Sequence, residues 1–127
     1  MSLQDRNILI VEDQLVITLD LEQAILDAGG RVIGPAADVS DALRLLNVER
    51  VDAAILDVDL QREDVSLVVE MLLDRGIPFI FHTGIEVPPA LRRRCPEAPV
   101  HTKPASSDVL IASLAAVMSR PRQPEAA

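Results

Sequence analysis

The feature that most constrains this chain is an apolar run at residues 53–59, AAILDVD, in which four aliphatic residues lead directly into Asp57. A strand covered by helices on both faces reads as a continuous apolar run, because neither face meets water. The run therefore predicts a buried strand of a parallel sheet that ends at Asp57. Ligands bind beyond the carboxyl ends of strands in open α/β sheets, so Asp57 is the first candidate for chemistry. A turn-forming role is the alternative, since Asp is common in turns.

The same kind of pattern recurs along the chain. Short apolar runs predict four further strands, at residues 7–11, 31–35, 77–82 and 99–102. Helical spacing of apolar residues predicts helices at 14–28, at a stretch ending near 48, at 65–73, at 90–95 and at 109–118, with a polar loop at 61–64. Prolines limit the fourth helix to a short or distorted one. Five strands alternating with five helices predict an α/β fold with a parallel sheet covered by helices on both faces.

Composition narrows the class of protein. The chain has 127 residues, which fits one domain, and it carries a net charge of -8 with no Trp or Tyr. Acidity and a lack of aromatic residues argue against direct nucleic-acid binding. The N-terminus resembles no signal peptide, no apolar run is long enough for a membrane span, and the lone Cys95 forms no internal disulfide. We therefore expect a cytoplasmic protein with one domain at residues 1–120, a flexible tail at 121–127 and no output domain.

Polar residues follow four of the predicted strands. They are Glu12 and Asp13, Asp57, Thr83, and Lys103. Parallel strands present their carboxyl ends at one edge, so these side chains are expected to converge. Carboxylates suit a hard divalent cation such as Mg²⁺ or Mn²⁺, which would also relieve the repulsion between them. A metal and an ammonium group would neutralise a transferring phosphoryl group, with Asp57 as its nucleophile and Thr83 as a hydrogen-bond donor. Taken singly, each residue has a simpler role, such as helix capping or a solvated surface charge.

With these residues in place, the chain resembles the receiver domain of two-component response regulators over nearly its whole length. The matching motifs, in order, are Glu12-Asp13, Asp57, Thr83-Gly84 and Lys103-Pro104. Segments 32–36 and 76–84 look similar to a subgroup of single-domain receivers from alphaproteobacteria. The resemblance implies a doubly wound, flavodoxin-like sheet with the strand order 2-1-3-4-5.

The resemblance also implies residue roles. Asp57 would accept a phosphoryl group from a histidine kinase or phosphotransfer protein. Mg²⁺ would be bound by the Asp13 and Asp57 side chains and the Asp59 backbone carbonyl, with Glu12 assisting through water. Thr83 and Lys103 would contact the phosphoryl group. Such a chain would be a phosphoacceptor regulator rather than an enzyme, with self-catalysed phosphotransfer and slow autodephosphorylation as its only activities.

Several positions depart from the family pattern. Val100 occupies the switch position, three residues before the lysine, where Tyr or Phe is frequent, and Ala105 stands where Phe is common. Ile85 replaces the aromatic residue that is usual in the similar subgroup. Asp59 and Ile85 lie where the family places side chains over the route of attacking water, so they are expected to tune the lifetime of the phosphoryl group. We therefore expect phosphorylation to alter the loop after the fourth strand and its neighbour more than the face formed by the fifth strand.

Two other function classes remain open at this point. Asp57-Val58-Asp59 also resembles the nucleophile motif of haloacid-dehalogenase-like phosphatases, but the position of Glu12-Asp13 ahead of every other motif is against it. A receiver-like adaptor that binds partners without phosphorylation is the second alternative. A true receiver could signal by docking to a downstream protein or could drain phosphoryl groups from a kinase, and the sequence does not choose between these roles.

Four other features are given structural interpretations. His82 and His101 are expected to be partly buried imidazoles with satisfied hydrogen bonds, and strand alternation places His82 on a different side from Thr83. The run Arg92-Arg93-Arg94 is interpreted as a solvated helix face rather than a docking site. Cys95 has no general base nearby in the sequence, so it is interpreted as structural.

Overall fold

The computed structural model describes residues 2–121, so residues 122–127 of the expected tail lie outside the described part of the chain. The strands are β1 Asn7–Val11, β2 Arg31–Ala36, β3 Ala53–Leu56, β4 Phe79–Thr83 and β5 Val100–Thr102. The helices are α1 Leu15–Asp27, α2 Val39–Val48, α3 Ser66–Asp74, α4 Pro89–Arg94 and α5 Ser107–Met118. The predicted alternation of strands and helices is confirmed.

All five strands pair in parallel in the order β2-β1-β3-β4-β5, which confirms the predicted sheet. The chain first moves outward from β1 to β2 and then crosses back to β3 on the other side of β1. The carboxyl ends of β1 and β3 therefore flank the switch point, where open α/β sheets form a crevice. Asp57 directly follows β3, and Glu12 directly follows β1.

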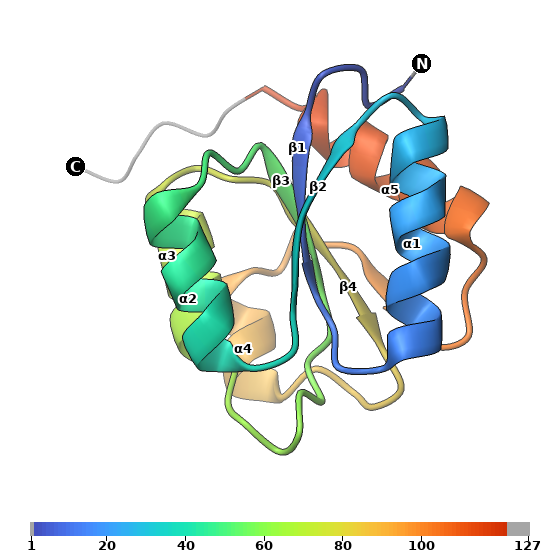
Figure 1. The fold of residues 1–127 in the computed structure, drawn as a ribbon. Coiled ribbons are helices and arrows are strands. Elements are labelled where there is room, and N and C mark those ends of the chain that lie inside the picture. The colour runs from blue at the N-terminus through green and yellow to red at the C-terminus, as the bar shows by residue number, and fades with distance from the viewer. Residues whose placement is uncertain (1, 122–127) are drawn as a thin grey trace.

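Two layers of helices cover the sheet (Figure 1). Helices α2, α3 and α4 lie on one face, and α1 and α5 lie on the other. The first core includes Leu45, Leu46 and Leu72 from α2 and α3, while the second includes Leu21 of α1 and Leu114 of α5. Because both faces are covered, every residue of β3 is buried, which explains its continuous apolar sequence.

Helix α1 faces the core differently from the way its apolar residues suggest. Of the six apolar residues that predict it, only Leu21 and Ile25 are buried. The other four, Leu15, Val16, Leu19 and Leu26, are each at least 55% exposed. The buried stripe instead begins at Thr18, whose hydroxyl donates to the Leu15 carbonyl oxygen at 2.8 Å and so satisfies itself locally. A polar residue thus holds the first of the three core-facing positions of this helix.

Helix α4 is short, as the prolines predict, and spans only six residues. Pro88 precedes it and Pro89 is its first residue, a position where the missing N–H costs nothing. Within residues 2–121, no helix combines the length and the apolar character that a bilayer crossing requires.

Candidate functional site

Sheet hydrogen bonds continue past the ends of β1 and β3 and fix the two central carboxylates. The Glu12 N–H donates to the Ala36 carbonyl at 2.9 Å, and the Asp57 N–H donates to the Val11 carbonyl at 2.9 Å. Both residues are only 3% exposed. The sheet itself therefore carries two acidic side chains into a nearly buried position at its carboxyl edge.

Lys103 joins these carboxylates. Its Nζ lies 2.8 Å from Asp57 Oδ2 and 2.7 Å from Glu12 Oε1. A third hydrogen bond runs from the same Nζ to Gln14 Oε1 at 2.9 Å. The backbone is held as well, because the Lys103 N–H donates to the Thr83 carbonyl at 2.9 Å. Three protons of the ammonium group thus have three acceptors.

Glu12 serves two purposes at once. Its Oε2 accepts the backbone N–H groups of Asp13 at 3.0 Å and of Gln14 at 3.1 Å, while its Oε1 binds Lys103. The simpler interpretation of Glu12 as a residue that organises the start of α1 is therefore compatible with a place in the site. Its second oxygen fixes the loop that carries Asp13.

The electrostatics follow from this burial. Burial raises the pKa of Glu12 above its ordinary value, and the hydrogen bond from Lys103 opposes that shift only in part. Burial alone would lower the pKa of Lys103, but its hydrogen bonds to Asp57 and Glu12 raise that pKa above the ordinary value. Lys103 therefore stays charged at neutral pH and is the cation that the two acids require.

The acidic groups are placed as ligands of one cation. Glu12, Asp13 and Asp57 each offer an oxygen atom within 4.8 Å of the others. Asp57 Oδ1 accepts the Asp59 N–H at 3.0 Å, which orients the carboxylate and leaves it further lone pairs. One ammonium group faces three carboxylates, and an all-oxygen donor set of this charge suits Mg²⁺ better than a softer metal. Asp13 and Asp57 are the residues best placed to hold it, because Glu12 already accepts hydrogen bonds from Lys103 and from two backbone N–H groups, whereas Asp57 accepts one from Lys103 and one from the backbone.

Thr83 lies at the end of β4 and is 1% exposed. Its Oγ1 accepts the backbone N–H of Ile85 at 3.3 Å. Within residues 2–121 this hydroxyl has no hydrogen bond to Asp57 or Lys103, so the structure brings it to the right edge of the sheet without direct contact. Ile85 itself is 49% exposed, and Val100, at the switch position, is 39% exposed.

An open hollow of about 340 Å³ lies over the acids. Its lining residues are Asp13, Gln14, Asp57, Asp59, Gln61, Arg62, Gly84 and Lys103. The sequence singles out only Asp13, Asp57, Asp59 and Lys103 as functional residues among these, with Gly84 noted as part of a motif. Gln14, Gln61 and Arg62 are missed, and the available signal is the position of Gln14 directly after the acidic pair and of the other two in the loop after β3.

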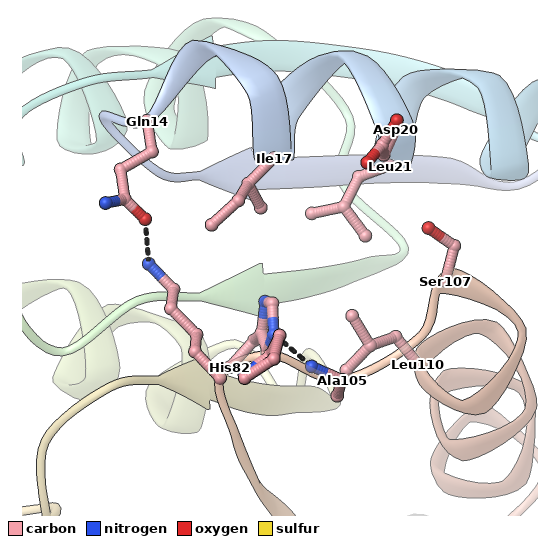
Figure 2. A pocket seen from close by; sticks show the side chains of 10 residues that line it. Gln14, Ile17, Asp20, Leu21, His82, Ala105, Ser107 and Leu110 are labelled. Atoms are coloured by element: carbon pink, nitrogen blue, oxygen red, sulfur yellow. Dashed lines mark hydrogen bonds between the residues drawn. The ribbon is translucent and has the colours of Figure 1, made fainter.

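A second hollow of about 410 Å³ adjoins the first and shares Gln14 and Lys103 with it. Figure 2 shows His82 below the α1 residues Ile17 and Leu21, with Leu110 of α5 beside it. The expectation that His82 is fully satisfied is wrong. Its Nε2 accepts the Ala105 N–H at 3.4 Å, but its Nδ1 is buried without a hydrogen-bond partner in the described part of the chain. His82 is 4% exposed, and burial, followed by the charge of Lys103, lowers its pKa.

The remaining candidates have structural surroundings. His101 Nε2 lies 2.7 Å from Ser113 Oγ, so that imidazole does have a partner. Arg92 donates to the carbonyl oxygens of Cys95 and Ala98, and Arg94 pairs with Glu70. Only Arg93 of this run fits a purely solvated face. Cys95 is 5% exposed, and burial raises the pKa of its thiol, which makes it less reactive.

Known proteins share this fold. No family model matches the chain. The transcriptional regulatory protein PdtaR of Mycobacterium tuberculosis is 30% identical over 80 residues, which cover 62% of this chain and 39% of PdtaR. The structure of a response regulator receiver protein from Sinorhizobium medicae matches with a TM-score of 0.80 and 22% identity, over 94% of this chain and 98% of that one. The non-phosphorylated HemR receiver domain of Leptospira biflexa matches with a TM-score of 0.76 and 25% identity, covering 94% and 98%.

The chain has the fold and the acidic pocket of a response-regulator receiver domain. Both receiver structures are covered almost end to end, whereas this receiver domain spans about two fifths of PdtaR. Its pocket of Glu12, Asp13 and Asp57 is typical of the phosphoacceptor site of such domains, which are generally regulators rather than enzymes. The same pocket is consistent with the Mg²⁺ site of receivers.

Proposed function

We propose that this receiver domain accepts a phosphoryl group on Asp57 from a histidine kinase or a phosphotransfer protein, in the presence of Mg²⁺. The observation that carries the proposal is the position of the Lys103 ammonium, 2.8 Å from Asp57 and 2.7 Å from Glu12 at the mouth of an open acidic hollow. A nearly buried carboxylate held beside a fixed cation and open to solvent on one side is suited to receive a phosphoryl group.

Each residue has a distinct task in this proposal. Asp57 Oδ attacks phosphorus, the bond to the donor nitrogen breaks, and its electron pair leaves with that nitrogen. Asp13 and Asp57, with the Asp59 carbonyl, would hold the Mg²⁺, which supplies positive charge to the transferring group. Glu12 keeps Lys103 and the Asp13 loop in place through its two oxygens.

Thr83 completes the site after phosphorylation. Its hydroxyl oxygen accepts a hydrogen bond from the Ile85 N–H in this structure. We propose that the hydroxyl reorients and donates a hydrogen bond to a phosphoryl oxygen once Asp57 is phosphorylated. Asp59 and Ile85 then flank the new group and tune its lifetime. Because histidine-kinase donors act in the cytoplasm, we expect the domain to act there, without direct nucleic-acid or membrane contact.

Incubation with phosphoramidate and Mg²⁺ tests the proposal by intact-protein mass spectrometry. We expect an adduct of one phosphoryl group that disappears in Asp57→Asn and persists in Asp64→Asn, a matched change at an exposed acid in the loop before α3. Continued phosphate release from an unrelated phosphomonoester would favour a phosphatase. Absence of any adduct on the wild type would favour an adaptor that works without phosphorylation.

We further propose that output passes through the loop after β4 rather than through β5. Val100 lacks the aromatic ring that usually reports the movement of Thr83. The backbone N–H of Ile85, in contrast, donates a hydrogen bond to the Thr83 hydroxyl. Amide exchange with and without a beryllium fluoride complex, which mimics a bound phosphoryl group, checks this. Protection should change at residues 84–88, and a change confined to residues 99–103 would contradict the proposal.

A further inference from the structure

The loop after β3 contains an unusual tight turn at residues 60–63. The Glu63 N–H donates to the Leu60 carbonyl at 2.9 Å, and the two central residues, Gln61 and Arg62, have φ angles of 53° and 64°. Two successive left-handed residues define a type I′ turn, for which Gly, Asn and Asp are the favoured residues. Neither Gln nor Arg belongs to that group, so the chain places two bulky side chains where the backbone disfavours them.

Both ends of this turn are anchored. Leu60 is fully buried, and Glu63 Oε1 accepts the Val39 N–H at the start of α2, at 3.2 Å. The surrounding structure therefore imposes the left-handed conformation on Gln61 and Arg62. Strained backbone of this kind persists where the neighbouring packing determines it, and it clusters at ligand-binding and active sites.

The turn contributes Gln61 and Arg62 to the lining of the hollow over Asp57. Four acidic residues surround this hollow or its floor, namely Glu12, Asp13, Asp57 and Asp59. Lys103 already donates to Asp57, Glu12 and Gln14. Arg62 is exposed and has no hydrogen bond or ion pair within residues 2–121. It is therefore the uncommitted cation at the rim of the site.

We propose that Arg62 binds the phosphoryl group of the phosphodonor as it enters the hollow and holds it against Asp57. This inference deepens the proposed phosphoacceptor function and rests on it. A guanidinium group suits the task because its planar donors bind two phosphoryl oxygens at once and it is always charged. Its positive charge also adds to those of Lys103 and of the Mg²⁺ that the acids would hold, and so offsets the repulsion between the donor's negative oxygens and the acids of the hollow.

The chemical step remains the one described above. With phosphoramidate as donor, Asp57 Oδ forms the new P–O bond, the P–N bond breaks, and its electron pair leaves on nitrogen as ammonia from the protonated donor. Arg62 takes no part in bond making or proton transfer. It contacts the equatorial oxygens, so its loss weakens binding of the donor and leaves the identity of the nucleophile unchanged.

The test compares Arg62→Gln and Arg62→Gly with the wild type and with Arg93→Gln, which removes an equal charge from exposed α4. The second-order rate constant for phosphorylation by phosphoramidate should fall about tenfold in both Arg62 variants, the amount expected for losing a charge-assisted hydrogen bond. Affinity for beryllium fluoride at saturating Mg²⁺ should fall in parallel, which gives a readout independent of turnover. Arg93→Gln should match the wild type in both measurements.

The two Arg62 variants separate the side chain from the backbone. Gly adopts a positive φ without strain, whereas Gln keeps the strained conformation. Equal losses in both variants support binding by the guanidinium group, and a loss in Arg62→Gly alone would assign the effect to turn geometry and overturn the proposal. Wild-type behaviour in both would overturn it as well while leaving Asp57 phosphorylation intact. Failure of the wild type itself to form an adduct would overturn this inference together with the proposed function.

Discussion

Two hollows lie on either side of the Lys103–Gln14 hydrogen bond, and they differ in what surrounds their buried polar groups. In the hollow over Asp57, the buried carboxylates of Asp57 and Glu12 are paired with an ammonium group at 2.8 Å and 2.7 Å. In the hollow between α1 and α5, the buried His82 has one nitrogen without a partner (Figure 2). In the hollow over Asp57, the buried charged groups are paired with one another and line a ligand site. In the hollow beside His82, a buried polar atom has no partner and is surrounded by apolar side chains.

This difference concerns how each hollow affects the stability of the fold. Paired buried charges are neutral or costly for folding compared with apolar packing, but removing one partner is severe. An unpaired imidazole N–H carries only a modest desolvation cost. Removing the Lys103 cation should therefore destabilise the fold strongly, whereas removing the unpaired imidazole should stabilise it slightly.

Lys103→Met should give the largest effect. It leaves Glu12 and Asp57 nearly buried and facing each other without a cation, which we expect to lower the free energy of unfolding by about 3 kcal/mol at neutral pH. Urea unfolding in EDTA measures the change. Added Mg²⁺ should restore part of the lost stability, because it binds the same acids. An unchanged midpoint would mean that the two carboxylates have another source of compensation.

Asp13→Asn should have a smaller effect of the opposite sign. Asp13 is partly exposed and adds a third negative charge to the cluster without pairing with Lys103. Removing that charge relieves repulsion, so stability without metal should rise by about 1 kcal/mol, a gain typical of functional sites. Stabilisation by Mg²⁺ in thermal unfolding should largely disappear. Asp20→Asn on α1 is the matched control, and equal behaviour of both variants would contradict a metal role for Asp13.

The residues that carry these two predictions could be found from the sequence, because parallel strands bring their carboxyl ends together whatever the loops do. Glu12, Asp13, Asp57 and Lys103 each follow an apolar run, and the sheet order then decides their convergence. Contacts that depend on side-chain conformation leave no comparable pattern in the sequence. The hydrogen bond from Lys103 to Gln14 joins residues 89 positions apart and follows no strand-end rule.

Other features could not be predicted from the sequence, because contacts in the folded structure override a local sequence preference. Thr18 takes a core-facing position on α1 that apolar periodicity assigns to its neighbours, since its hydroxyl satisfies itself on the preceding turn. The left-handed turn at Gln61 and Arg62 carries none of the Gly or Asn residues that would predict it. The anchoring of Leu60 and Glu63 at its ends is tertiary, so the sequence indicates only a loop there.

A third effect, smaller than either substitution above, appears as a pH dependence. Burial raises the pKa of Glu12 above 4.5 in the folded protein, so its contribution to stability is fully present below pH 4.5 and is lost as pH rises through the folded pKa. Without metal, Glu12→Gln should therefore become more stable relative to the wild type as pH rises from 4.5 toward neutrality. Urea midpoints across that range measure the difference. A difference that shrinks with rising pH would contradict the raised pKa.

His82→Leu should have the smallest effect and should stabilise the fold. Neutral His82 accepts the Ala105 N–H on Nε2, so its proton resides on Nδ1 and is a buried donor without a partner in the described residues. Leucine removes that donor and extends the apolar surface formed by Ile17, Leu21 and Leu110. The hydrogen bond to Ala105 that is lost is long, at 3.4 Å, so the gain in stability should exceed the loss. The free energy of unfolding should rise by about 0.5 kcal/mol.

Phosphorylation of Asp57 by phosphoramidate should be unchanged in His82→Leu, because the lining of this hollow shares only Gln14 and Lys103 with the lining of the acidic hollow. A loss of phosphorylation without a loss of stability would show that His82 acts on Lys103, and the two hollows would then have to be treated as one site.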